Sequence, residues 1–75
     1  MPVDAIFDRY RVAGVDDGGA IKYYGYLSIS GAWYILEEDT TNKTFKYAKG
    51  TSDFGTNWTG RAGLTYRFYN EVFIG

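Results

Sequence analysis

The stretch AIKYYGYLSISGAWYILEED, residues 20–39, decides the fold. Both of its halves are rich in Tyr, Ile, Leu and Trp, and such residues pack well on a pleated strand. Ser30-Gly31 stands between the halves, and a Gly-containing dipeptide between two such runs is typical of a hairpin turn. The stretch therefore predicts two antiparallel strands, at 20–29 and 32–39, that close on Ser30-Gly31.

Two more turn signals flank this hairpin. Asp16-Asp17-Gly18-Gly19 precedes it and Thr41-Asn42-Lys43 follows it. Asp-Gly and Asn residues favour tight turns, and Asn42 is suited to the left-handed conformation. These turns predict further strands at 9–15 and 44–49. A fifth strand is predicted at 63–69, where apolar and polar residues alternate.

The segment between the last two strands has a helical pattern. Ser52 or Asp53 can cap a helix start. Phe54, Trp58 and Ala62 then recur at four-residue intervals, which places them on one helical face. We expect a short helix whose aromatic side plugs one end of the sheet.

Together these elements predict an all-β fold of five antiparallel strands with one short helix near 52–62. A sheet of this size usually hides its edges by curling into a small barrel, so we expect a barrel of SH3-like or OB-like kind. With 75 residues the chain suffices for one small domain, spanning 1–75. Cysteine is absent, so the fold is expected to hold without disulfides.

The turn positions also predict which side chains share a face. Closing each hairpin on its turn residues sets Arg11 opposite Tyr24 and Tyr26 opposite Ile35. One face then becomes a core of Tyr10, Val12, Ile21, Tyr23, Leu27, Ile29, Tyr34, Leu36, Phe45 and Tyr47. The other face mixes rings with charges: Arg9, Arg11, Val15, Lys22, Tyr24, Tyr26, Ser28, Trp33, Ile35, Glu37, Lys46 and Ala48.

This outer face is the candidate working surface, because Tyr, Trp and Arg are enriched where proteins bind one another. The predicted binding residues are Arg9, Arg11, Lys22, Tyr24, Tyr26, Trp33, Ile35, Phe73 and Ile74. The last two are apolar and close to the C-terminus, so they either complete the barrel or dock on a neighbouring subunit. Three alternatives stay open for the outer rings: they only cover exposed sheet, they stack on single-stranded nucleic acid, or they bind a glycan.

Arg61 follows Trp58 in the predicted helix. An arginine stem commonly packs on aromatic surface. We therefore expect Arg61 to stack on the Trp58 ring or to pair with a carboxylate of the sheet, in a structural role.

Composition argues against an enzyme. The chain has no histidine and no cysteine, which excludes Ser–His and Cys–His nucleophiles and removes the usual zinc ligands. No cofactor and no metal are predicted. The net charge of −1 gives no overall basic footprint for nucleic acid. No apolar run approaches the ~20 residues of a membrane span, and the N-terminal residues lack the pattern of a signal peptide. We therefore expect a protein that is cytoplasmic at synthesis and has no membrane partner.

Several short motifs, taken in order along the chain, resemble those of a group of short uncharacterised proteins encoded by tailed bacteriophages near virion structural genes. The motifs are Tyr23-Tyr24-Gly25-Tyr26, Gly31-Ala32-Trp33-Tyr34-Ile35, Tyr47-Ala48-Lys49-Gly50, Trp58 with Arg61-Ala62, and Leu64-Thr65-Tyr66. The resemblance implies a virion-associated role and carries over no catalytic residue. With the aromatic outer face, it leads us to expect a non-enzymatic structural or interaction protein that assembles with itself or with a larger virion protein.

Overall fold

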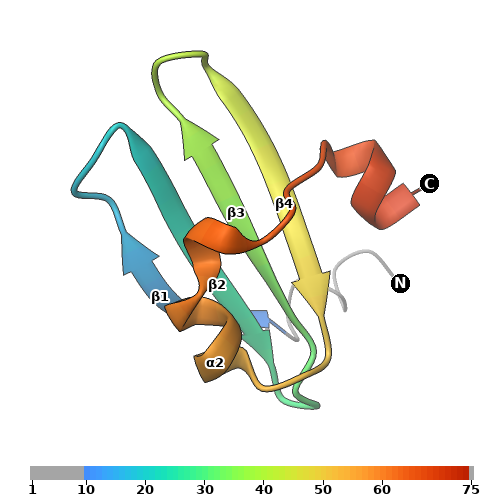
Figure 1. The fold of residues 1–75 in the computed structure, drawn as a ribbon. Coiled ribbons are helices and arrows are strands. Elements are labelled where there is room, and N and C mark those ends of the chain that lie inside the picture. The colour runs from blue at the N-terminus through green and yellow to red at the C-terminus, as the bar shows by residue number, and fades with distance from the viewer. Residues whose placement is uncertain (1–9, 75) are drawn as a thin grey trace.

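The computed structural model describes residues 10–74, with the backbone alone for Phe73 and Ile74. Four strands form one antiparallel sheet in the order β1-β2-β3-β4 (Figure 1): β1 (Tyr10–Asp16), β2 (Ile21–Ser28), β3 (Trp33–Asp39) and β4 (Thr44–Gly50). Three short helical segments follow: α2 (Phe54–Thr59), the 3₁₀ turn η1 (Arg61–Gly63) and the π-helical turn η2 (Asn70–Ile74). The expectation of a mostly β fold with a short helix is confirmed.

Closure into a five-stranded barrel is not observed. Within the described residues the sheet is open, and β1 and β4 are its edges. The segment predicted as a fifth strand, 63–69, makes one antiparallel bridge, in which Arg67 exchanges two backbone hydrogen bonds with Tyr47 of β4. No helix among residues 10–74 is long and apolar enough to cross a membrane.

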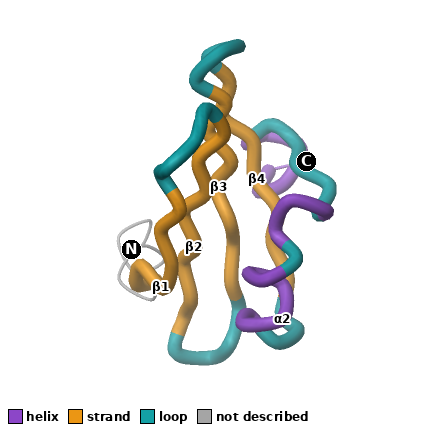
Figure 2. Tube along the Cα trace, turned by 60° about the vertical axis from the view of Figure 1, so that its left-hand side comes forward, coloured by secondary structure: helices purple, strands orange, loops and turns teal. Residues whose placement is uncertain are grey.

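The molecule has two layers, and they leave the sheet asymmetric. Figure 2 shows the helical segments on one side of the strands. We call the side under α2 and η1 the covered face, and the opposite side the open face. Successive side chains of a strand alternate between these faces, so the register of each hairpin decides which residues are buried.

The turn between β2 and β3 is one residue longer than the sequence pattern predicts. Gly31 has a φ of 96° and its N–H donates to the Ser28 carbonyl at 3.1 Å. A glycine with positive φ at the end of a three-residue loop is a standard way to join two strands. Tyr26 consequently lies opposite Tyr34 and not opposite Ile35. This shift of one residue exchanges the predicted faces of β3 and β4.

β1 contains a second irregularity that the pattern did not reveal. Its register with β2 changes between Val12, opposite Tyr26, and Gly14, opposite Gly25, so Ala13 forms a bulge. The bulge moves Arg11 to the covered face, opposite Leu27. Its predicted partner was Tyr24, and the connection between β1 and β2 is also longer than the predicted Asp-Gly turn, since Asp16 lies opposite Tyr23. The predictions that placed Tyr10 and Val12 in the core are wrong because of the bulge.

The turn between β3 and β4 is held by Asp39. Its Oδ1 accepts the backbone N–H groups of Thr41 and Asn42, both at 3.0 Å. Lys43, with a φ of 58°, takes the left-handed conformation predicted for Asn42. Asp39 lies opposite Thr44, whereas a hairpin closed on Asn42-Lys43 would set it opposite Lys46, two residues further along β4. A shift of two residues leaves the shared faces of β3 and β4 unchanged.

The core lies between the covered face and the helical layer. Trp33, Ile35 and Ala48 are 4%, 0% and 9% exposed. The partly buried residues packed against them are Tyr23, Leu27, Phe54, Trp58, Leu64 and Tyr66. The prediction that Trp33, Ile35 and Ala48 belong to the outer face is wrong. Ile29, predicted in the core, is 98% exposed at the tip of its turn.

Two glycines let α2 approach the middle of the sheet. Gly14 and Gly25 lie opposite each other in the β1–β2 ladder. A Cβ atom on Gly14 would stand 2.7 Å from Trp58 Cε2, and one on Gly25 would stand 2.6 Å from Phe54 Cζ. The aromatic side of α2 therefore lies flat on bare backbone and does not plug the end of a barrel. Asp53 caps the helix as one of the two predicted candidates, since its Oδ2 accepts the Thr56 N–H at 2.9 Å.

Candidate functional site

A row of tyrosines crosses the open face from one edge of the sheet to the other. Each strand contributes one ring and the C-terminal segment adds a fifth: Tyr10, Tyr26, Tyr34, Tyr47 and Tyr69, here called the tyrosine row. Tyr26 and Tyr34 are stacked, with ring centroids 4.6 Å apart. Tyr10 meets Tyr34 edge-on at 5.1 Å, and Tyr69 meets Tyr47 edge-on at 5.6 Å.

The register of the sheet produces this row. Tyr26 lies directly opposite Tyr34, and Leu36 directly opposite Tyr47, so the rings of β2, β3 and β4 are close neighbours on one face. The bulge in β1 brings Tyr10 to the same face. Aromatic pairs of this kind stabilise a sheet by about 0.5–1.5 kcal/mol beyond the area they bury. The row therefore helps to hold the four strands together from the side without a helix.

Exposed apolar side chains flank the tyrosine row. Val12 and Val15 of β1 are 61% and 54% exposed, and Phe45 of β4 is 52% exposed. Tyr69, at the end of the row, is 50% exposed. The open face is thus rich in aromatic and apolar groups that remain in contact with water.

The electrostatic character of the row follows from its packing. Burial, with the neighbouring Tyr26, Tyr47 and Tyr10, raises the pKa of Tyr34 to about 12. Burial likewise raises the pKa of Tyr47. Both rings therefore stay neutral throughout the physiological pH range, as hydrogen-bonding and apolar groups together.

Charged side chains on the open face are few and mostly basic. Lys22 lies opposite Glu38, Lys49 opposite Tyr34, and Arg67 opposite Tyr47. The Tyr24 hydroxyl donates to Glu38 Oε1 at 3.4 Å, the outer limit of a hydrogen bond. The face can accordingly offer ring surfaces, phenolic hydroxyls and a modest excess of positive charge to a ligand.

The structure brings together only some of the predicted binding residues. Lys22, Tyr24 and Tyr26 share the open face. Arg11 lies on the covered face at the β1 edge, while Trp33 and Ile35 are buried in the core and cannot reach a ligand.

Three further predicted residues cannot be placed. Arg9 lies outside the described residues, and so do the side chains of Phe73 and Ile74. Their predicted roles in binding therefore stay predictions.

Sequence reasoning missed the centre of the site. Tyr10, Tyr34 and Tyr47 were expected in the core, yet they form most of the row on the open face. Gly31 is the signal that could have placed Tyr34 and Tyr47, since glycine after a two-residue turn is typical of a three-residue loop. That loop places Tyr34 beside Tyr26. Tyr10 depends instead on the bulge in β1.

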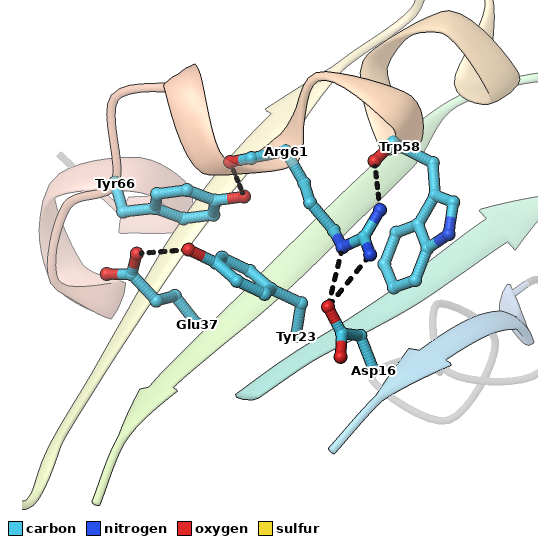
Figure 3. A network of polar contacts seen from close by, with 6 residues as sticks. All are labelled: Asp16, Tyr23, Glu37, Trp58, Arg61 and Tyr66. Carbon is cyan, nitrogen blue, oxygen red and sulfur yellow. Dashed lines mark hydrogen bonds and ion pairs between the residues drawn. The ribbon is translucent and has the colours of Figure 1, made fainter. Parts of the chain in front are cut away.

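The covered face carries a polar network of a different kind, centred on Arg61 (Figure 3). The guanidinium donates to Asp16 Oδ2 from Nη2 at 2.8 Å and from Nε at 3.2 Å, and to the Trp58 carbonyl at 2.7 Å. It also lies 4.4 Å from the centroid of the Trp58 ring. Arg61 thus stacks on Trp58 and also pairs with a sheet carboxylate, whereas the sequence predicted one contact or the other.

These contacts shift the pKa values of the members of the network. The Arg61 hydrogen bond holds the pKa of Asp16 below its usual range. The Tyr66 hydroxyl donates to the Arg61 carbonyl at 2.8 Å, and burial raises the pKa of Tyr66. Burial and the adjacent Glu37 carboxylate raise the pKa of Tyr23. Within residues 10–74 no three acidic side chains gather in a way that could hold a metal ion.

A groove of about 530 Å³ beside β4 is a weaker candidate for a binding site. Lys49, Arg67 and Glu71 line it together with the edge of Trp33. The Trp33 indole N–H already donates to the Ser52 carbonyl at 2.8 Å, so this donor is not directed into the groove. The tyrosine row is the more distinctive surface.

No family model, curated protein or solved structure matches this chain. The chemistry of the open face is therefore the basis for a functional assignment. Its aromatic and apolar groups favour a role in binding.

Proposed function

We propose that this chain is a non-enzymatic interaction protein that docks on another protein through its open face. The observation that carries the proposal is the tyrosine row, flanked by the exposed Val12, Val15 and Phe45. Tyrosine is enriched in protein interfaces because its ring buries a large area while its hydroxyl remains compatible with water. A face of this composition can remain in contact with water in the free protein, and a partner that covers it removes apolar surface from water.

The resemblance to short tailed-bacteriophage proteins supplies the class of partner to test first, a virion structural protein. Such a partner would meet a rigid, four-stranded surface whose rings are already ordered by one another. Little side-chain entropy is then lost on binding, which favours affinity.

The test compares two lysine substitutions at exposed apolar positions. Phe45→Lys changes the open face, whereas Ile29→Lys changes a turn tip whose side chain is 98% exposed. Binding of the purified chain to each virion structural protein of its source is measured by interferometry. We expect one partner to bind, a loss of at least about tenfold for Phe45→Lys, and no loss for Ile29→Lys. Absence of any partner, or equal losses in both variants, would contradict the proposal.

A second function is favoured by the charge of the open face. Among the described residues of the strands and of the bridge to β4, Lys22, Lys49 and Arg67 accompany the rings, and Glu38 is the one carboxylate beside them. Stacking rings with scattered cations are how many sheets bind single-stranded nucleic acid. Trp33 and Trp58 lie on the covered side, so their fluorescence would not report such binding.

Anisotropy of a labelled oligonucleotide is the appropriate measurement for this alternative. Nucleic-acid binding predicts an increase at low salt that disappears as salt is added. An unchanged anisotropy at low salt excludes it.

A further inference from the structure

β1 presents an edge that the described chain does not pair. The opposite edge, β4, is partly occupied by the backbone bridge between Tyr47 and Arg67. On the outer side of β1 no strand lies within residues 10–74, as the order of the sheet shows (Figure 1). An edge of this kind exposes N–H and C=O groups that can accept a further strand.

The sequence of β1 is complementary to itself when two copies run antiparallel. A two-fold axis between Ala13 and Gly14 sets Val12 opposite Val15 of the second copy. The same axis sets Arg11 opposite Asp16 of the second copy. One register thus satisfies an apolar pair and an ion pair, and symmetry repeats both.

The bulge in β1 is what makes this register work. In a regular strand, residues three apart point to opposite faces, so Val12 and Val15 could not meet. The extra residue at Ala13 brings both valines to the open face, where they are 61% and 54% exposed. It also places Arg11 and Asp16 together on the covered face, opposite Leu27 and Tyr23.

The charges at the two ends of β1 suit a symmetric pair. Asp16 already binds Arg61, yet 38% of its side chain stays exposed, which leaves room for a second guanidinium. Asp17, the next residue, is exposed as well. Arg11 is exposed at the other end of the strand.

We propose that two copies of this chain pair antiparallel through the outer edges of β1 and form one continuous sheet. The pairing joins the two open faces into a single surface. The pairing deepens the proposed interaction function because it names a second copy of the chain as a first partner. It rests on that proposed function only where the joined open faces are treated as a docking surface.

Disulfide trapping tests the register directly, because the chain contains no cysteine of its own. Directly opposite residues of antiparallel strands have Cβ atoms about 4.5–5.5 Å apart, close enough for a disulfide after a small adjustment. Val12→Cys mixed with Val15→Cys should therefore form a linked dimer under mild oxidation. Each variant alone places its cysteines about 10 Å apart in the dimer and should link several-fold more slowly.

Sedimentation equilibrium provides the second measurement. We expect a dimer that Arg11→Glu weakens at least about tenfold, since it sets glutamate against Asp16 of the second copy. Phe45→Lys should leave the dimer intact, although it weakens docking at least about tenfold under the proposed function. The two proposals can thus fail separately.

Three results would overturn the β1 pairing. The first is a monomer at every concentration measured. The second is equal linking of Val12→Cys alone and of the mixture. The third is a dimer that Phe45→Lys dissociates and Arg11→Glu does not, which would indicate pairing through the open faces.

Discussion

The covered face and the open face of the sheet both carry aromatic rings, but the rings pack differently on the two faces. On the covered face, Phe54 and Trp58 lie on the bare backbone of Gly14 and Gly25, and a helical layer seals them. On the open face the tyrosines stack on one another and stay partly exposed. The contrast separates rings that pack in the core from rings that stabilise the sheet while staying partly exposed.

The polar groups follow the same division. On the covered face, the Arg61 guanidinium donates hydrogen bonds to the Asp16 carboxylate and to the Trp58 carbonyl. On the open face, the tyrosine hydroxyls and a few cations border the rings. On the covered face the hydrogen bonds of Arg61 are therefore made within the chain, whereas the open face has the composition of an interface.

The largest expected difference between the faces concerns two adjacent residues of β3. Ile35 is 0% exposed in the core, whereas Leu36 lies partly exposed on the open face. Ile35→Ala should cost about 2–5 kcal/mol of unfolding free energy through the cavity it leaves. Leu36→Ala should cost about 1 kcal/mol, because its side chain buries less area. Urea unfolding measures both, and equal losses would erase the distinction between the faces.

The glycine platform under α2 gives the next largest effect. Gly25→Ala places a Cβ atom 2.6 Å from Phe54 Cζ, so the helix must shift. We expect a loss of about 1–3 kcal/mol in the free energy of unfolding. Gly18→Ala is the matched control, since a Cβ there meets nothing within 4 Å and should change stability by less than about 0.5 kcal/mol. A Gly25→Ala protein as stable as the wild type would mean that α2 does not rest on this site.

The contribution of the Arg61 network to stability should depend on pH in the acidic range. The Arg61 hydrogen bond lowers the pKa of Asp16, so its contribution is present above the unfolded-state pKa of about 3.9 and is lost as pH falls through the lower folded-state value. Asp16→Asn should therefore lose less stability than the wild type between neutral and strongly acidic pH. Asp39 and Asp53, whose pKa values are also lowered, supply the loss that remains. Unfolding curves that run parallel in the two proteins would contradict this assignment.

The tyrosine row should show the smallest effect, at alkaline pH. The pKa of Tyr34 is raised to about 12, so folding favours its neutral form. The contribution is complete below the unfolded-state pKa of about 10 and is lost as pH rises through about 12. Tyr34→Phe should reduce the loss of unfolding free energy at alkaline pH. Urea unfolding measures this loss, and tyrosinate absorbance measures the ionisation of the tyrosines. The same comparison near pH 8 is the control, because the Tyr34 hydroxyl is protonated there in both the folded and the unfolded state. If the alkaline stability curve of Tyr34→Phe matched that of the wild type, the result would argue against a buried Tyr34.

Local patterns predicted much of this molecule. The four strands of the sheet, the helix capped by Asp53 and, as alternatives, the two contacts of Arg61 were all predicted from residue types and spacing. The strands and the helix cap depend on local preference, and the Trp58 contact of Arg61 joins residues three apart, whereas its Asp16 partner lies 45 residues away and was predicted only as a carboxylate of the sheet. The chemistry of the candidate site was also foreseen in part, since Lys22, Tyr24 and Tyr26 do share a face.

The membership of the two faces could not be predicted in the same way. One extra residue in the loop that ends at Gly31, and one at the Ala13 bulge, exchange inside and outside along the strands beyond them. Both alternatives place apolar residues on each side, so hydrophobic pattern alone does not choose between them. The choice moved Trp33 into the core and Tyr34 out of it.

The sequence by itself determined the approximate positions of the four strands and of the loops between them, and the abundance of rings, because these follow from backbone preference and side-chain type. Only the tertiary structure decided which rings are buried. The reason is steric: α2 packs where Gly14 and Gly25 leave the backbone bare, and both glycines lie on one side of the sheet. That side became the core, and the tyrosine row was left facing outward.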